Sequence, residues 1–147
     1  MKPFCSVGSL DTSFPYLLAE TMRNMKLTNN VVPIDEANVK VNLSEYDYII
    51  RGKLNKTELE THVNIIPLGI LSILGAPVAF HNFTLNYEIQ LFESSNMQKP
   101  IFTETYSRDL TAAQGMYYGQ SACFDLFIEA LEKTLPLVVN DIASKIK

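Results

Sequence analysis

The C-terminal part of the chain constrains the fold most, because most of its large apolar residues fall on one side of a predicted helix. Apolar residues recur every three or four positions from 124 to 146, over about six helical turns. The stripe consists of Phe124, Phe127, Ile128, Leu131, Leu135, Val138, Val139, Ile142 and Ile146. A helix with one apolar stripe must bury it against another layer of secondary structure. The sequence therefore predicts a two-layer fold closed by this helix.

The other predicted elements supply that second layer. A shorter amphipathic helix is expected over 14–26, with Ser13 as its N-cap and Pro15 just inside its start. Alternating or short apolar runs predict strands at 4–8, 31–34, 46–54 with a weak continuation to Thr61, 84–93 and 101–107. The order is β-α-β-β-β-β-α. We expect an α+β fold in which two helices pack on one face of a mixed, mainly antiparallel sheet of about five strands.

Composition narrows the class of protein. The chain has 147 residues, which predicts a single domain over 1–147. Lys and Arg number 12 against 16 Asp and Glu, so the formal charge of −4 argues against nucleic-acid binding. The two cysteines, Cys5 and Cys123, are too few for a disulfide framework or a zinc site; they form one bridge or remain free thiols.

One internal segment is unusual in having no charged residue. Residues 61–87 contain no Asp, Glu, Lys or Arg over 27 positions. The centre, 64–80, joins two predicted strands. It is shorter than the roughly 20 apolar residues that a membrane-spanning helix needs, and its prolines and glycines interrupt any regular helix. Three interpretations stay open: a loop that caps the core, a docking element for a partner or second subunit, or a membrane contact. Its candidate binding residues are Ile65, Ile66, Leu68, Ile70, Leu71, Ile73 and Leu74.

Other candidate residues have simpler explanations. Tyr117 and Tyr118 lie in a glycine-bounded loop that covers the end of the sheet or forms the edge of a ligand site. His62 and His81 could face each other across a hairpin, but two histidines make an incomplete metal site, so we expect them at strand ends. The acidic residues of the last helix are expected on its solvated side: Asp125, Glu129 and Glu132. Known catalytic motifs are missing. We expect no catalytic residue, no cofactor and no metal.

Four pieces of the sequence together resemble small bacterial envelope lipoproteins. They are 15–22 (PYLLAETM), 46–54 (YDYIIRGKL), the apolar loop 64–80, and 115–118 (GMYY) before a long closing helix. The pattern is similar to the N-terminal domain of the Tol-Pal β-propeller protein and to the periplasmic domain of the curli-secretion lipoprotein. Cys5 follows Lys2-Pro3-Phe4 rather than an L-x-[AG]-C lipobox. The resemblance therefore implies either an anchor lost with a leader or a likeness of fold alone.

The resemblance implies a non-enzymatic protein of the cell envelope that assembles with other envelope proteins or with itself. It would belong to a transport or secretion system, in the periplasm, and at the outer membrane if a lipidated leader precedes the chain. The apolar loop 64–80 would be its docking element or its membrane contact. The alternative is a module that binds a small apolar ligand or a lipid in a pocket under that loop.

Overall fold

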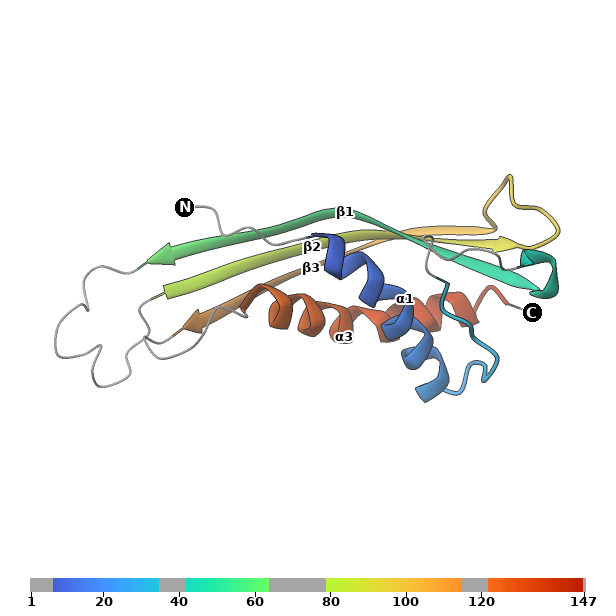
Figure 1. Cartoon of the computed structure of the whole chain (residues 1–147), viewed down its shortest axis with the longest axis horizontal. Coiled ribbons are helices and arrows are strands. Elements are labelled where there is room, and N and C mark those ends of the chain that lie inside the picture. Colours follow the sequence, from blue (N-terminus) through green and yellow to red (C-terminus); the bar gives the residue numbers. More distant parts are fainter. Residues whose placement is uncertain (1–6, 35–41, 64–78, 115–121, 147) are drawn as a thin grey trace.

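The described residues form a three-stranded sheet, two α-helices and one short 3-10 helix (Figure 1). The computed structural model describes residues 7–34, 42–63, 79–114 and 122–146. The elements in chain order are α1 (Val7–Asn24), the short 3-10 helix η2 (Leu43–Glu45), β1 (Tyr48–Val63), β2 (Ala79–Glu93), β3 (Phe102–Gln114) and α3 (Ala122–Ala143). The strands lie in the order β1-β2-β3, and both pairings are antiparallel.

Both helices pack on the same side of the sheet, where α3 contacts β2 and β3, and α1 contacts β1 and α3 (Figure 1). The central strand β2 shows why, because its odd-numbered side chains form the floor of the core. Those that are 0–1% exposed are Phe83, Leu85, Tyr87, Ile89 and Leu91. The α3 stripe meets them with Phe127, Leu131, Leu135, Val138, Val139 and Ile142, each no more than 1% exposed. Removing this apolar surface from water stabilises the two-layer arrangement.

β1 is one long strand with an irregularity in the middle. Leu54 pairs with Tyr87 and Lys56 pairs with Asn86, so Asn55 is an extra residue in β1. An extra residue reverses which side the following side chains face. This explains why the apolar alternation of 48–54 weakens in the sequence after residue 54.

The prediction of about five strands in a mixed sheet is wrong. Val31, Pro33 and their neighbours pair with no strand among the described residues. The carbonyl of Val31 instead accepts a 2.6 Å hydrogen bond from the Arg23 guanidinium, and Pro33 has no N–H to give to a ladder. Of the strand predicted at 4–8, residues 7 and 8 are helical, and 4–6 lie outside the described residues.

The first helix also begins earlier than predicted. It starts at Val7, so Ser13 and Pro15 lie inside it and Ser13 is not its N-cap. Proline removes one backbone donor, which weakens a helix locally without always ending it. The helix ends at Asn24, shortly before Lys26, whose φ of 57° is in the left-handed region that often terminates helices.

Candidate interaction surface

The predicted binding residues belong to two connections at one end of the sheet. Two ranges outside the described residues, 64–78 and 115–121, contain all of these candidates. The first holds Ile65, Ile66, Leu68, Ile70, Leu71, Ile73 and Leu74, and the second holds Tyr117 and Tyr118. The flanking strand ends are described. Val63 pairs with Ala79, and Ala79 pairs with Gln114. The two candidate segments are therefore attached side by side to the same end of the sheet.

The two histidines lie on opposite faces of the sheet, so they do not face each other. His81 pairs with Thr61, whereas His62 pairs with Phe80. The His81 ring is buried on the helix side, and its Nδ1 lies 2.9 Å from Thr61 Oγ1. His62 is exposed on the open side, with its Nε2 3.8 Å from Glu60 Oε2. A shared metal site is excluded by this register, because adjacent positions in a strand point to opposite faces.

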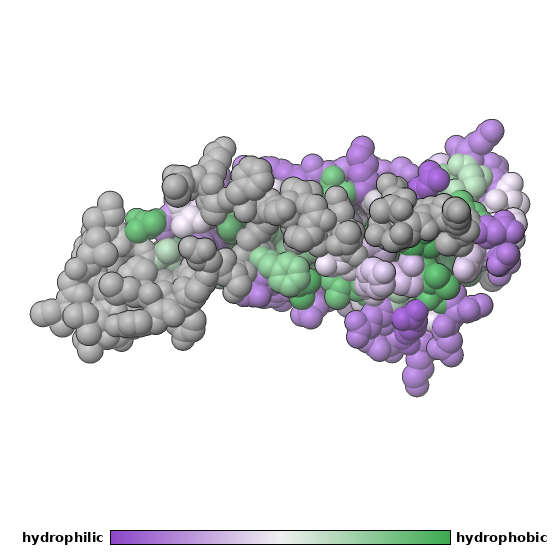
Figure 2. All heavy atoms as spheres, in the orientation of Figure 1, coloured by the Kyte–Doolittle hydropathy of each residue, from purple (hydrophilic) through white to green (hydrophobic). Residues whose placement is uncertain are grey.

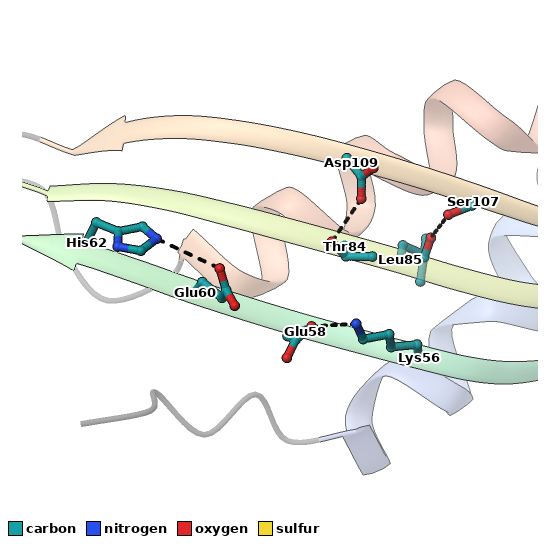
Figure 3. A network of polar contacts seen from close by, with 8 residues as sticks. All are labelled: Lys56, Glu58, Glu60, His62, Thr84, Leu85, Ser107 and Asp109. Atoms are coloured by element: carbon teal, nitrogen blue, oxygen red, sulfur yellow. Dashed lines mark hydrogen bonds and ion pairs between the residues drawn. The ribbon is translucent and has the colours of Figure 1, made fainter.

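The face of the sheet away from the helices is polar and open among the described residues (Figure 3). Its polar contacts run both along and across the strands. Lys56 Nζ lies 2.6 Å from Glu58 Oε2 in β1, and the hydrogen bond and charge of Glu58 raise the pKa of Lys56. Thr84 donates a 2.8 Å hydrogen bond from β2 to Asp109 in β3. This face therefore carries charges of both signs in contact with water.

This polar character is concentrated along β1. Its open side carries both signs of charge: Arg51, Lys53, Lys56, Glu58, Glu60 and His62. Figure 2 shows hydrophilic side chains along the margin of the molecule where β1 runs. The guanidinium of Arg51 lies 5.2 Å from the ring centre of Phe92 and covers this apolar ring, which is only 4% exposed. On this face, the buried ring of Phe92 is thus covered by a cation.

The two margins of the sheet differ. β1 is interrupted by the bulge at Leu54/Lys56, whereas β3 pairs with β2 from Phe102 to Gln114 without a register shift. Neither strand has a second pairing partner within the described ranges. Strand margins of this kind offer backbone N–H and C=O groups to another strand.

Two tyrosines bring hydroxyl groups into the core. Tyr87 stacks on Tyr106 with ring centres 5.6 Å apart. Burial raises the pKa of Tyr87 to about 12, although its hydrogen bond to Thr134 opposes the rise. Burial, the hydrogen bond to Asp141 and nearby carboxylates raise the pKa of Tyr106. Both phenols therefore stay protonated at neutral pH and act as hydrogen-bond donors to α3.

An apolar hollow of about 460 Å³ opens between the two helices. It is lined by Ser13, Tyr16, Leu17, Phe124 and Ile128. Tyr16 is 58% exposed and Phe124 is 46% exposed, so two large rings of this hollow contact solvent. Sequence analysis placed Phe124 in the buried stripe, and its exposure at the first turn of α3 corrects that prediction.

The cysteines and the acidic residues of α3 show no arrangement typical of a metal site in the described part of the chain. Cys123 is the second residue of α3, and Cys5 lies outside the described residues. Asp125, Glu129 and Glu132 are exposed, and Glu129 forms an ion pair with Lys133 one turn later. Over the described ranges, no group of three or more His, Cys, Asp or Glu side chains is placed to hold a metal ion. No helix in those ranges is long and apolar enough to cross a membrane.

No protein-family model matches the chain, and no curated protein matches it in sequence.

Sequence reasoning missed β3 as a surface of interest. It predicted a strand only over 101–107, whereas β3 continues to Gln114. The signal that could have extended it is the continued alternation through Leu110 and Ala112, together with Thr111, a residue that favours strands.

Proposed function

We propose that the protein is a non-enzymatic interaction domain, an assembly component of a cell-envelope transport or secretion system. The observation that carries the proposal is the one-sided packing of the sheet. Both helices pack on one face, while the described residues leave the charged face and the margins of β1 and β3 open. Open strands and charged faces are common elements of protein recognition. The resemblance to envelope lipoproteins supports the periplasm as the location, at the outer membrane if a lipidated leader precedes the chain.

The docking element is the apolar segment 64–80. Its charge-free composition favours contact with a partner protein, a second copy or a membrane over contact with water. The paired ends Val63, Ala79 and Gln114 support a joint surface with Tyr117 and Tyr118, because both connections leave the same end of the sheet. In this proposal, the long rigid strands hold the docking end away from the helix layer.

A site-specific photo-crosslink from Leu71, in the full-length protein in its native cells, tests the proposal. We expect adducts to one defined envelope protein. The same probe at Ser95, an exposed residue in the β2–β3 connection at the opposite end of the sheet, is the matched control and should give none. Adducts only to lipid, or only within the chain itself, would contradict the proposed role in assembly.

Substitutions in the same segment separate docking from folding. Ile70→Asp and Leu74→Asp should abolish the crosslinked complex and leave the melting temperature almost unchanged, since a charge at a docking position outside the core costs little stability. A large loss of thermal stability in both variants would instead assign the segment to the core.

The second candidate is a module that binds a lipid or another small apolar ligand. The pocket expected under the loop 64–80 falls on residues outside the described ranges. A different place, the hollow between α1 and α3, supports this candidate because it presents the exposed rings of Tyr16 and Phe124. We expect co-purified lipid in a native mass spectrum and its loss in Phe124→Ser. Substitution of Val32, an exposed apolar residue that does not line this hollow, should leave the lipid in place. An empty spectrum and no thermal shift with phospholipid vesicles would exclude this candidate.

A further inference from the structure

The outer margin of β3 has fewer of the features that keep an exposed strand from pairing than the margin of β1, and its protective charges are limited to Glu104, Arg108 and Asp109. β3 is 13 residues long and contains no proline, no lysine and no bulge. β1, the other margin, has a bulge and the lysines Lys53 and Lys56. Bulges, prolines and lysines are the common means by which edge strands avoid pairing with another chain. Every second residue of β3 also has backbone groups that β2 does not use, because an antiparallel neighbour takes only alternate residues. Within the described ranges, β3 is therefore the margin better suited to pair with a further strand.

The residues of β3 are complementary to the same strand running in the opposite direction. On the helix side the order is Phe102, Glu104, Tyr106, Arg108, Leu110. Antiparallel pairing centred on Tyr106 places Glu104 opposite Arg108 of the second strand and Arg108 opposite its Glu104. It also places Phe102 opposite Leu110, both partly buried against the core. Opposite charges and apolar pairs directly across two strands are the contacts that stabilise a sheet.

Other registers lose this complementarity. Centring the pairing on Glu104 places two glutamates opposite each other, and centring it on Arg108 places two arginines opposite each other. Centring on Thr105 or Ser107 leaves both charges opposite uncharged residues. Glu104 and Arg108 are exposed, and neither forms an ion pair within the described part of the chain. The two charges are thus available to a partner in one register only.

The helix layer adds an apolar contact at the same place. Tyr106 donates a 2.7 Å hydrogen bond to Asp141, so this side of α3 lies next to β3. Leu137 is one turn before Asp141 on the same side of α3, and it is 56% exposed. A second copy joined at β3 would bring its own Leu137 toward the same junction.

We propose that the protein forms a homodimer by antiparallel pairing of β3 with β3 of a second copy, centred on Tyr106. A twofold axis perpendicular to the sheet relates the copies, so the two three-stranded sheets join into one of six strands. All four helices then lie on the same side. This surface is distinct from the docking segment 64–80. A negative result in the test of the dimer would therefore not contradict the proposed docking role of that segment.

Charge reversal tests both the dimer and its register. We expect the wild-type chain to sediment as a dimer in analytical ultracentrifugation. Glu104→Arg or Arg108→Glu alone should raise the dissociation constant by on the order of tenfold or more, because each homodimer then has two like-charge pairs. Lys53→Glu, a reversal of an exposed charge on β1, is the matched control and should leave the dimer intact.

Mixing the two single variants gives the decisive result. A Glu104→Arg chain and an Arg108→Glu chain restore both opposite-charge pairs when they combine, so the mixture should form heterodimers with a lower dissociation constant than either variant shows alone. The double variant Glu104→Arg/Arg108→Glu should recover the homodimer. A monomeric wild-type chain, or a dimer insensitive to these reversals, would overturn the proposal. Heterodimer formation also shows that both variants are folded, which far-ultraviolet circular dichroism checks independently.

Discussion

The phenol of Tyr87 donates a 2.6 Å hydrogen bond to the hydroxyl oxygen of Thr134, and both residues are buried between β2 and α3. Thr134 in turn donates a 2.9 Å hydrogen bond to the carbonyl of Ala130, one turn earlier in α3. The chain of donors leaves neither hydroxyl unsatisfied. It links the centre of the sheet to the middle of the long helix through polar groups inside an apolar core.

Thr134→Val should lower the free energy of unfolding by about 1–3 kcal/mol, because the buried Tyr87 hydroxyl loses its acceptor. Tyr87→Phe should lower the free energy of unfolding by only about 1 kcal/mol. The phenol donor is removed, but the Thr134 hydroxyl still donates its hydrogen bond to the Ala130 carbonyl. The double variant should lose less than the sum of the two. Urea unfolding of the four chains measures this coupling, and strictly additive losses would contradict the hydrogen bond.

Stability should decrease at high pH through the core tyrosines. The pKa of Tyr87 is about 12 in the folded chain, whereas the ordinary value for a solvent-exposed tyrosine is 10.0. The native state thus holds the phenol proton more tightly than the unfolded chain. The resulting contribution to the free energy of unfolding is fully present below about pH 10. It is lost as the pH rises toward 12, by up to about 3 kcal/mol. Urea unfolding from neutral pH upward should show this decrease, and Tyr87→Phe should reduce it. An unchanged slope in that variant would contradict the assignment.

Gly52→Ala should destabilise the packing of α1 on β1. An added Cβ at Gly52 would lie 2.5 Å from Cε1 of Phe14, whose ring also makes an edge contact with Tyr87 at 5.3 Å. The ring cannot move far without losing that contact, so we expect a loss of about 1–3 kcal/mol in unfolding free energy. Combining Gly52→Ala with Phe14→Leu should recover part of this loss. Equal losses in the two backgrounds would show that Phe14 is not the obstacle.

Asp141→Asn should change the titration of Tyr106 more than the stability of the fold. The asparagine retains an oxygen that can accept the Tyr106 hydrogen bond, but it removes the negative charge that helps to raise the Tyr106 pKa. Tyrosinate absorbance should therefore show one phenol titrating at lower pH. Asn140→Asp, which adds a charge at the neighbouring exposed position, is the control and should not lower that pKa.

Part of this architecture follows from local sequence patterns. The apolar stripe over 124–146 predicts α3, and the alternation around Leu85 and Ile89 predicts the buried face of β2. These patterns are readable because one turn of helix or two residues of strand repeat the same environment. They predict a two-layer fold without any knowledge of tertiary contacts.

What the tertiary structure alone decided is how these elements pair. The extra residue Asn55 shifts the face of the following side chains, and the β1–β2 register puts His62 and His81 on opposite sides. Val31 lies in no strand, because its carbonyl bonds Arg23 instead. The exposure of Glu104 and Arg108 depends on β3 lying at the margin of the sheet. Local periodicity shows which side chains share a face, but pairing and register arise from contacts between residues far apart in the chain, and no short window of sequence contains them.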